Sequence, residues 1–483
     1  MSFVQFEYLP FFLLVFAINW VLPGPRAKNV FLLVASYIFY GWIHPWMTVL
    51  LFGITGMNFL AGQAIVRWPG QKDRFVGAVI ALSIANLCLF KYFGFFSGEI
   101  LPRFVDVESA SSVAAWNLVL PLGLSFYTFH NLSYTIEVYR ERFPVKRNFV
   151  DYFLYGSFFP QLVAGPIERA SNVMPQLERD RRFDGSQVAS GLGLFLWGAF
   201  KKVALADAIA PYTDMMFLAE DPNAAMVWTG ALGFTIQALA DFSGYTDMAR
   251  GSSRMLGIEL MDNFAHPYLA ASPMEFWQRW HISFSTWLRD YIYVPACFSD
   301  WVRRYVRIPF TGEWGPFATT SRALLLTMLV SGIWHGSTWN YIVWGLYYFV
   351  IGTVYAGLQP RLPKKWRKDA RWRYLMVPIM FGFTVFGMYI FREPSIPRLA
   401  SRLLLSPFAG TPEQWTVSLA MVGVCAYASL PLLAGLAYER YVRDRVVGTA
   451  AWPVLQTATW AVLAIAALAS VRMTETDFIY FQF

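Results

Sequence analysis

Two short stretches of this sequence combine ionisable side chains with glycine and tryptophan, and each contains a histidine. The first is Ser331-Gly-Ile-Trp-His-Gly-Ser-Thr-Trp-Asn340, which places His335 between two glycines. The second runs from Ser272 to Tyr293 and contains His281. A neutral imidazole can take up and return a proton near physiological pH. Both stretches are therefore candidates for proton-transfer chemistry.

The other three histidines are weaker candidates. His44 precedes a proline in a loop and receives no role, and His266 is interpreted as a turn residue. His130 lies in a helical pattern and is interpreted as a buried hydrogen-bonding partner. No two histidines stand four residues apart, so we predict no metal site. The chain also lacks a nucleophile elbow, a P-loop and a dinucleotide fingerprint.

Two acidic residues stand close together in Asp241-Phe-Ser-Gly-Tyr-Thr-Asp-Met-Ala-Arg250. Asp241 and Asp247 could line a cavity, or they could pair with a base at a helix end. Pairing is the favoured interpretation, since most charged groups in an apolar chain are neutralised locally.

The stretch from Ser272 to Tyr293 has the pattern of a helix that cannot cross lipid alone. Ser272 and Glu275 resemble a capping box, and the proline between them suits a first helical turn. Aromatic residues recur at helical spacing on one face, but the segment also carries several charges. We therefore expect it to lie in the membrane interface or to re-enter and line a cavity.

The position of His335 follows from the length of the apolar block before it. The 15 residues from Ser321 to His335 span only about 22 Å as a helix. A helix that enters the membrane after the basic stretch Arg303 to Arg307 would then end before the far side. His335 is predicted to lie at membrane depth on irregular backbone, where an ionisable group indicates function.

The amino-acid composition indicates the class of protein to which the two histidine stretches belong. Of 483 residues, 56% are hydrophobic and 14% are charged, whereas a soluble domain carries about 25% charged residues. The net charge of +8 fits basic loops at anionic lipid headgroups and does not indicate nucleic-acid binding. The three cysteines form no cluster. We predict an all-α polytopic membrane protein with a single membrane domain, residues 1–483.

Apolar blocks recur along the whole chain. The first, at about Leu9 to Leu22, lacks a basic region before it and is expected to be a retained span. A helix needs roughly 20 residues to cross the hydrocarbon core. We expect about ten or eleven full crossings, together with re-entrant and interfacial helices.

Basic clusters predict the orientation. The densest is Arg361-Leu-Pro-Lys-Lys-Trp-Arg-Lys-Asp-Ala-Arg-Trp-Arg373, which the positive-inside rule places in the cytoplasm. Three crossings are predicted after it, so both termini are expected outside the cytoplasm. The basic loop could also attract a polyanionic cytoplasmic donor such as a coenzyme A thioester.

Several motifs together resemble the membrane-bound O-acyltransferase family, in its bacterial branch of alginate O-acetyltransferases and D-alanyl-lipoteichoic acid transferases. The resemblance covers nearly the whole chain, and its ending Phe478-Ile-Tyr-Phe-Gln-Phe483 is especially similar to the alginate acetylation proteins. It rests on Pro121-Leu-Gly-Leu-Ser-Phe-Tyr-Thr-Phe129, Phe159-Pro-Gln-Leu-Val-Ala-Gly-Pro166, Asp241-Phe-Ser-Gly-Tyr-Thr-Asp247, Phe276-Trp-Gln-Arg-Trp-His-Ile-Ser283, Arg289-Asp-Tyr-Ile-Tyr293 and Gly332-Ile-Trp-His-Gly336.

The resemblance implies a ring of helices around a central funnel, with His335 at its narrow point and His281 at a second family position. Acyl transfer to a hydroxyl needs a base and oxyanion donors. We assign His335 as the base, and His281 with Arg279 to orientation or oxyanion support. The sequence leaves open a transient acylation of His335. Further residues expected to line or support the funnel are Trp280, Trp334, Asn340, Asp241 and Asp247.

The same resemblance implies an O-acyltransferase of the bacterial inner membrane that uses acetyl-CoA or another acyl thioester, without a metal. The acetyl group would move to hydroxyls of alginate or another extracytoplasmic polysaccharide. Its expected partners are a periplasmic SGNH-type or membrane-anchored protein and a polysaccharide synthesis and export complex. D-alanyl transfer to teichoic acid and peptidoglycan O-acetylation remain alternatives within the family.

Two alternatives lie outside acyl transfer. A polysaccharide transporter or flippase would also have many spans and broken helices, but it would need no acyl donor. A non-catalytic membrane subunit could hold a secreted acetyltransferase at the surface. Neither alternative requires an imidazole at position 335.

Overall fold

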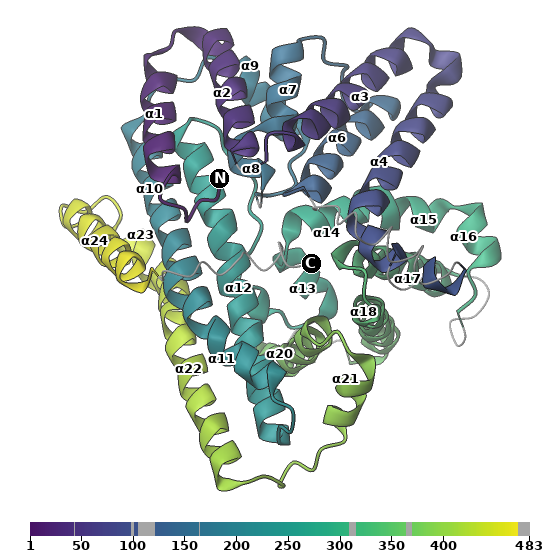
Figure 1. Ribbon diagram of the computed structural model, residues 1–483, viewed down its shortest axis with the longest axis vertical. Coiled ribbons are helices and arrows are strands. Elements are labelled where there is room, and N and C mark those ends of the chain that lie inside the picture. Colours follow the sequence, from purple (N-terminus) through teal and green to yellow (C-terminus); the bar gives the residue numbers. More distant parts are fainter. Residues whose placement is uncertain are drawn as a thin grey trace. The chain divides into compact units, whose positions relative to one another are not determined.

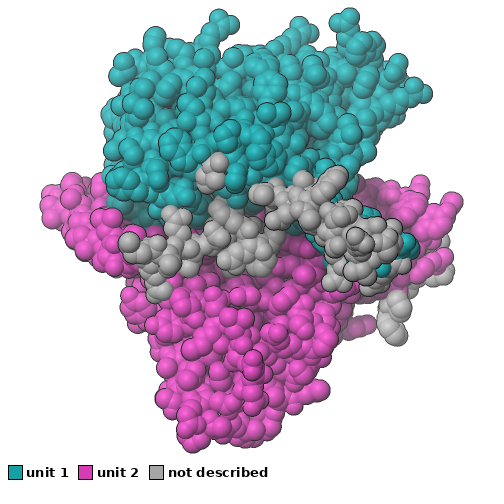
Figure 2. Space-filling model, viewed as in Figure 1, with its two compact units in different colours: residues 1–199, 245–261 teal, residues 200–244, 262–483 magenta. Residues whose placement is uncertain are grey.

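A computed structural model describes residues 1–42, 44–97, 101–104, 121–163, 165–308, 315–363 and 370–471. Within these residues the chain is helical and contains no strand, which confirms the all-α prediction (Figure 1). Contacts between residues divide the chain into two compact units, coloured separately in Figure 2. Unit 1 comprises residues 1–199 and 245–261, and unit 2 comprises residues 200–244 and 262–483. A single membrane domain over the whole chain stays a prediction.

Eight helices of the described residues are long and apolar enough to cross a membrane, and the 14-residue helix Tyr8–Val21 is shorter. This character confirms a polytopic membrane protein. The eight compare with the ten or eleven crossings that the sequence predicts. Residues 115–120, the start of the apolar block predicted at 115–138, lie outside the described residues. The eight are Met47–Arg67, Pro69–Phe95, Gly185–Leu218, Pro316–His335, Trp339–Arg361, Arg371–Arg392, Pro412–Val446 and Trp452–Ser470.

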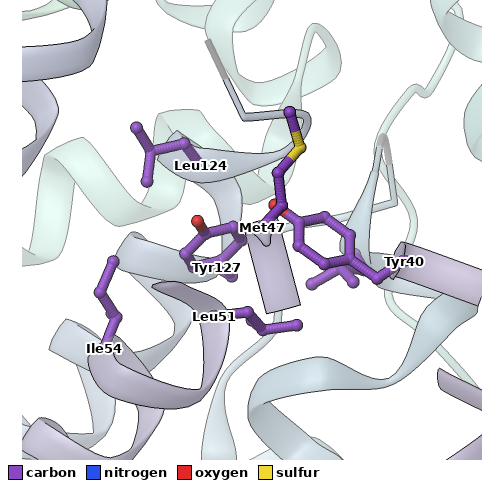
Figure 3. Packing of buried hydrophobic residues seen from close by; sticks show 7 residues of the cluster. Tyr40, Met47, Leu51, Ile54, Leu124 and Tyr127 are labelled. Atoms are coloured by element: carbon purple, nitrogen blue, oxygen red, sulfur yellow. The ribbon is translucent and has the colours of Figure 1, made fainter. Parts of the chain in front are cut away.

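Unit 1 is built around a core of apolar side chains from α2, α3, α6 and α8 (Figure 3). Tyr40 and Tyr127 pack edge to face at 6.1 Å in this core, and the Tyr40 hydroxyl donates to the carbonyl of Leu122. Burying such rings together provides both apolar contact and a defined geometry. The helices of unit 1 are α1 (Tyr8–Val21), α2 (Gly24–Gly41), α3 (Met47–Arg67), α4 (Lys72–Phe95), α6 (Leu124–Tyr139), α7 (Phe149–Ser157), α8 (Phe159–Leu162), α9 (Ala170–Glu178) and α10 (Gly185–Ala199).

Unit 2 contains every residue of the histidine stretches. Helix α12 (Ala224–Met255) begins in this unit, and its last turns belong to unit 1. The other helices are α11 (Asp207–Leu218), α13 (Pro273–Arg279), α14 (Ile282–Leu288), α15 (Val294–Phe298), α16 (Asp300–Tyr305), α17 (Pro316–His335), α18 (Trp339–Leu358), α20 (Ala370–Arg392), α21 (Ile396–Leu403), α22 (Pro412–Ala437), α23 (Arg443–Val446) and α24 (Trp452–Ser470). Short π-helices are η4 (Phe200–Ala206), η6 (Arg289–Tyr293) and η8 (Tyr438–Val442), and short 3₁₀-helices are η5 (Pro267–Leu269) and η7 (Gln359–Arg361).

The pair α17 and α18 forms a closely packed helical hairpin within unit 2. A Cβ atom added to Gly332 would clash with the carbonyl oxygen of Tyr341, and one added to Gly345 would clash with that of Met328. Only glycine permits this approach of two backbones, as at many helix contacts in membranes. The hairpin therefore fixes His335, at the end of α17, against the side chains of α18.

The predicted surroundings of His335 are wrong in one respect. Helix α17 begins at Pro316, before the expected start at Ser321, and its 20 residues are long enough to cross a membrane. His335 is the last helical residue and Gly336 has extended backbone. The helix is therefore not too short to reach the far side of the membrane. Pro316 and the four apolar or neutral residues after it lengthen it at its N-terminal end.

The stretch from Ser272 to Tyr293 is not one continuous helix, so the expected single aromatic stripe is also wrong. Ser272 caps α13 by accepting from the backbone N–H of Glu275, but the Glu275 carboxylate binds the N–H of Ala271 and does not complete the capping box. Helix α13 ends at Arg279, and His281 has φ 44° before α14 begins. The segment is not among the eight possible spans, as predicted.

Candidate active site

His335 is buried among aromatic rings at the C-terminal end of α17. Its ring packs edge to face against Trp344 of α18 at 4.9 Å and against Phe391 of α20 at 5.1 Å. The adjacent Trp334 lies 4.8 Å away. Such an apolar surround excludes water, which strengthens electrostatic interactions with any group that enters it. Three helices of unit 2 thus hold this imidazole in place.

His281 lies in the break between α13 and α14. It is 1% exposed, and its Nδ1 lies 3.1 Å from the side-chain oxygen of Asn263. Burial lowers the pKa of His281 to about 3, because the charged imidazolium loses its hydration. The ring is therefore neutral at physiological pH. A left-handed conformation is uncommon for a residue other than glycine and is often found at functional sites.

The two imidazoles belong to one aromatic cluster. Phe284 of α14 lies 5.1 Å from the His281 ring and 5.9 Å from the His335 ring. Trp334 lies 6.1 Å from His281 and 4.8 Å from His335, and it stacks on Phe284 at 4.1 Å. The structure thus brings together the two histidines that the sequence singled out 54 residues apart, at positions 281 and 335.

Trp344 is a residue of this cluster that sequence reasoning missed. It packs against His335, and its indole Nε1 is buried without an acceptor among the described residues. A buried donor that lacks an acceptor costs about 1–3 kcal/mol. The Nε1–H can therefore donate a hydrogen bond to the carbonyl oxygen of a bound substrate. The spacing of nine residues between His335 and Trp344 gives no sequence signal, because the intervening turn separates their helices.

Arg279, Trp280 and Asn340 contact elements next to the cluster, and their role in supporting it stays a prediction. Arg279 donates to the Glu275 carboxylate and to the carbonyl of Ala265. Trp280 stacks on Phe276 at 5.8 Å. Asn340 donates to the carbonyls of Ile390 and Phe391, which joins the start of α18 to the end of α20.

Glu275 is held between two arginines. Arg373 of α20 donates hydrogen bonds from its two terminal guanidinium nitrogens to the Glu275 carboxylate. The Nη2 atom of Arg279 lies 2.9 Å from Oε1 of the same carboxylate. Partial burial acts to raise the pKa of Glu275, but the hydrogen bonds from Arg373 and from the Ala271 N–H outweigh it and lower that pKa. The helix before His281 is therefore anchored by charge to the first turn of α20.

The two acidic residues that the sequence singled out both form ion pairs. Asp241 lies 2.9 Å from the buried Lys202, which also pairs with Asp207. Asp247, in unit 1, pairs with Arg250 at 3.6 Å. The structure confirms the favoured interpretation, pairing, although Asp241 pairs with a residue of η4 and only the Asp247–Arg250 pair lies within α12. Phe242, next to Asp241, packs against the His281 ring at 4.7 Å.

The remaining histidines have structural positions. His130 in α6 of unit 1 is buried, and its Nε2 lies 3.1 Å from the carbonyl of Pro166. His266 is a turn residue with φ 50° whose Nε2 lies 3.0 Å from the Glu439 carboxylate. His44 is an exposed loop residue. Within the described parts of the chain, no three His, Cys, Asp or Glu side chains gather as metal ligands.

A known protein family matches the part of the chain that contains this site. The family model of MBOAT, the membrane-bound O-acyltransferase family, matches residues 78–299 and 296–392, which include both histidine stretches. The chain belongs to the membrane-bound O-acyltransferase family. It is therefore an O-acyltransferase, and the family resemblance seen in the motifs is confirmed.

Individual relatives of this family extend the match over most of the chain. The probable alginate O-acetylase AlgI of Azotobacter vinelandii is 35% identical, over 79% of this chain and 73% of the relative. A peptidoglycan O-acetyltransferase of Helicobacter pylori is 32% identical, over 72% of this chain and 68% of the relative. A teichoic acid D-alanyltransferase of Bacillus subtilis is 29% identical, over 76% of this chain and 90% of the relative.

Proposed function

We propose that this enzyme transfers an acetyl group from a cytoplasmic thioester to hydroxyls of an extracytoplasmic polysaccharide, alginate or another exopolysaccharide. The observation that carries the proposal is the buried cluster in which His335 and His281 share Phe284 and Trp334. The names of the relatives support an acetyl group. Identity is 35% with the probable alginate O-acetylase and 29% with the D-alanyltransferase.

His335 acts as general base in this proposal. Its imidazole accepts the proton of the attacking hydroxyl while the oxygen forms a bond to the thioester carbonyl carbon. The C–S bond then breaks, and the leaving thiolate takes the proton back from the imidazolium. Trp344 Nε1 is the candidate donor to the oxyanion that develops in between. The surrounding rings exclude water and so limit hydrolysis of the thioester.

The donor is proposed to be acetyl-CoA or another acyl thioester that arrives from the cytoplasm. Support comes from the basic run 361–373, of which residues 361–363 and 370–373 are described. The positive-inside rule assigns this run to the cytoplasm, and its charge attracts polyanions. Arg373, at the end of the run, is bound to Glu275 on the helix before His281.

The proposed location is the bacterial inner membrane, with both termini outside the cytoplasm. A reporter that is active only in the cytoplasm, fused after Phe483, should be silent, whereas one inserted after Pro363 should be active. Strong activity after Phe483 would contradict the orientation. The acetyl group is proposed to reach its acceptor through a periplasmic SGNH-type or membrane-anchored partner associated with the polysaccharide export complex.

The experiment that tests this function follows radiolabelled acetyl groups. Inverted membrane vesicles from cells that contain the enzyme, its proposed partner and the polysaccharide receive acetyl-CoA, and alkali-labile label on the polysaccharide is counted. The wild type should transfer label, and vesicles with equal amounts of the His335→Ala variant should not. Transfer of D-alanine without transfer of acetate would replace the proposal with the teichoic-acid alternative. Polysaccharide movement that needs no acyl donor would replace it with a transporter.

A further inference from the structure

The side-chain oxygen of Asn263 collects three hydrogen-bond donors at the break between α13 and α14. The backbone N–H of Ser283 lies 3.2 Å away, the Ser283 hydroxyl 2.9 Å, and the His281 Nδ1 3.1 Å. All of these atoms are buried in unit 2. Asn263 therefore connects the loop before α13 directly to the imidazole of His281.

These contacts determine which ring nitrogen of His281 carries a fixed proton. A backbone N–H can only donate, so the Asn263 atom that faces Ser283 N must be the carbonyl oxygen and not the amide nitrogen. The orientation of the amide thus follows without reference to the imidazole. A carbonyl oxygen can only accept, so Nδ1 of His281 must be the donor. This holds whether the ring is neutral or charged.

The backbone at this break is held separately from the Asn263 side chain. The N–H of Ile282 donates to the carbonyl oxygen of Asn263 at 2.9 Å, and the N–H of Ala265 donates to that of Arg279 at 2.9 Å. Any substitution of the Asn263 side chain leaves both bonds possible. The side chain can therefore be changed without removing the backbone contacts that support the turn at His281.

We propose that Asn263 is a positioning residue that keeps the proton on Nδ1 of His281, so that His281 exchanges protons through Nε2. In its neutral form His281 then presents a lone pair at Nε2 and acts as a proton acceptor, not as an N–H donor to an oxyanion. The role of His281 in turnover rests on the proposed acyl transfer, but the assignment of its tautomer does not.

Burial of His281 agrees with this role. Its lowered pKa of about 3 keeps the ring neutral, with Nε2 unprotonated, across the range in which cells grow. Two charged groups lie close to this turn along the chain or through Phe242: Arg279, which is paired with Glu275, and Asp241, which is paired with Lys202. Both are neutralised by their partners, so neither supplies a competing proton donor.

The tautomer can be measured directly by nitrogen-15 solid-state NMR. The full-length enzyme in lipid is labelled at histidine, and the His281→Gln variant assigns the His281 signals among the five histidines. At pH 7 we expect a protonated Nδ1 and an unprotonated Nε2. In Asn263→Leu the preference should be lost, and in Tyr268→Phe it should persist. The latter variant removes another side-chain hydrogen bond of the same loop, to the carbonyl of Thr235.

The Asn263→Asp variant tests the same contact in kinetics. Aspartate keeps an acceptor toward Nδ1 but adds a negative charge, which raises the pKa of His281 by about 1–3 units. The neutral, active ring is then lost as the pH falls through this raised pKa. We expect kcat near wild type at pH 8 and a steeper decline than wild type between pH 6.5 and 4. Asn263→Leu should lose at least about tenfold in kcat at every pH, since a wrong tautomer costs up to about 10⁴-fold in a hydrolase triad.

A wild-type spectrum with a protonated Nε2 and an unprotonated Nδ1 on His281 would overturn the proposal, as would an unaltered tautomer and pH profile in both Asn263 variants. Release of CoA thiol from acetyl-CoA, with alginate oligosaccharide as acceptor, provides the rates. If the wild type leaves acetyl-CoA intact, the proposed donor fails while the NMR result still decides the role of Asn263.

Discussion

The surroundings of His130 in unit 1 and of His281 in unit 2 show two uses of a buried histidine. His130 stands in the middle of α6, and its Nε2 donates to the carbonyl of Pro166. His281 stands at a helix break with φ 44°, and its Nδ1 donates to Asn263. The two rings are similarly buried, so burial alone does not distinguish a structural histidine from a functional one.

The neighbours of each ring make the difference. Around His130, the Tyr155 hydroxyl donates to the His130 carbonyl, and that of Tyr152 donates to Asn131. This is a network of polar groups that stabilise one another and the fold. His335 lies among aromatic rings, and His281 shares the rings of Phe284 and Trp334 with it while its Nδ1 keeps one polar partner, Asn263. An imidazole among aromatic rings is better suited to exchange a proton with a bound substrate than to stabilise the fold.

The largest effect should come from His335→Ala. The variant removes the proposed base, and positioned proton transfer contributes about 10²–10⁴ in rate. Acetyl transfer should fall by that factor while the protein still inserts and purifies, because little apolar area is lost. Rates of CoA release by purified enzyme, with expression matched by gel-filtration peak area, provide the measurement. Near-normal rates in a well-folded variant would reject His335 as base.

His281→Ala should lower the rate less than His335→Ala does, by about 10²-fold at the lower end of the same range. The variant removes one proton acceptor of the cluster but leaves His335 with Trp344 and Phe391. The same CoA-release assay, run beside His335→Ala, gives the ratio. A rate within threefold of wild type would show that His281 is structural, as His130 is.

Trp344→Phe should lower kcat by about tenfold and leave the fold intact. Phenylalanine keeps an aromatic ring against His335 but removes the Nε1–H, and one hydrogen bond of about 1.4 kcal/mol corresponds to a factor of ten. The loss should appear in kcat and not in KM if the bond forms to the developing oxyanion. An equal rise in KM with unchanged kcat would instead indicate binding of the ground-state carbonyl.

The smallest effect on activity should come from His130→Ala, with rates per folded enzyme within about threefold of wild type. This variant loses a buried hydrogen bond and leaves the Pro166 carbonyl without its donor, which costs about 1–3 kcal/mol of stability. Its melting temperature in detergent should therefore fall below that of His335→Ala. A catalytic defect as large as that of His335→Ala would remove the distinction between the two regions.

The sequence predicts much of this site because the relevant signals are local. His335 between glycines, the N-cap at Ser272 and the charged, non-spanning segment around His281 can each be recognised within a few residues. The helical, membrane-spanning character follows from composition and block length alone. The family motifs contain both histidines, and the comparison with relatives agrees with them.

The missed features depend on contacts between distant residues or on unusual backbone. Asn263 contacts His281 from 18 positions away, and Lys202 pairs with Asp241 from another helix. The left-handed backbone at His281 could not be predicted, because no glycine stands at this position. The predicted block from Ser321 to His335 misses the start of α17 at Pro316, because hydrophobicity marks an apolar block and not the first turn of the helix that contains it.

Photoaffinity labelling can show where the acyl donor binds relative to the two histidines of the cluster. An acyl-CoA with a diazirine in its acyl chain, photolysed in the wild-type enzyme in lipid, labels the residues that surround the reacting group. Mass spectrometry should find the label on peptides covering residues 276–288 and 334–344, and excess acetyl-CoA should prevent it. Competed labelling confined to residues 124–139, around His130, would contradict the assignment of the active site to the His335 and His281 cluster.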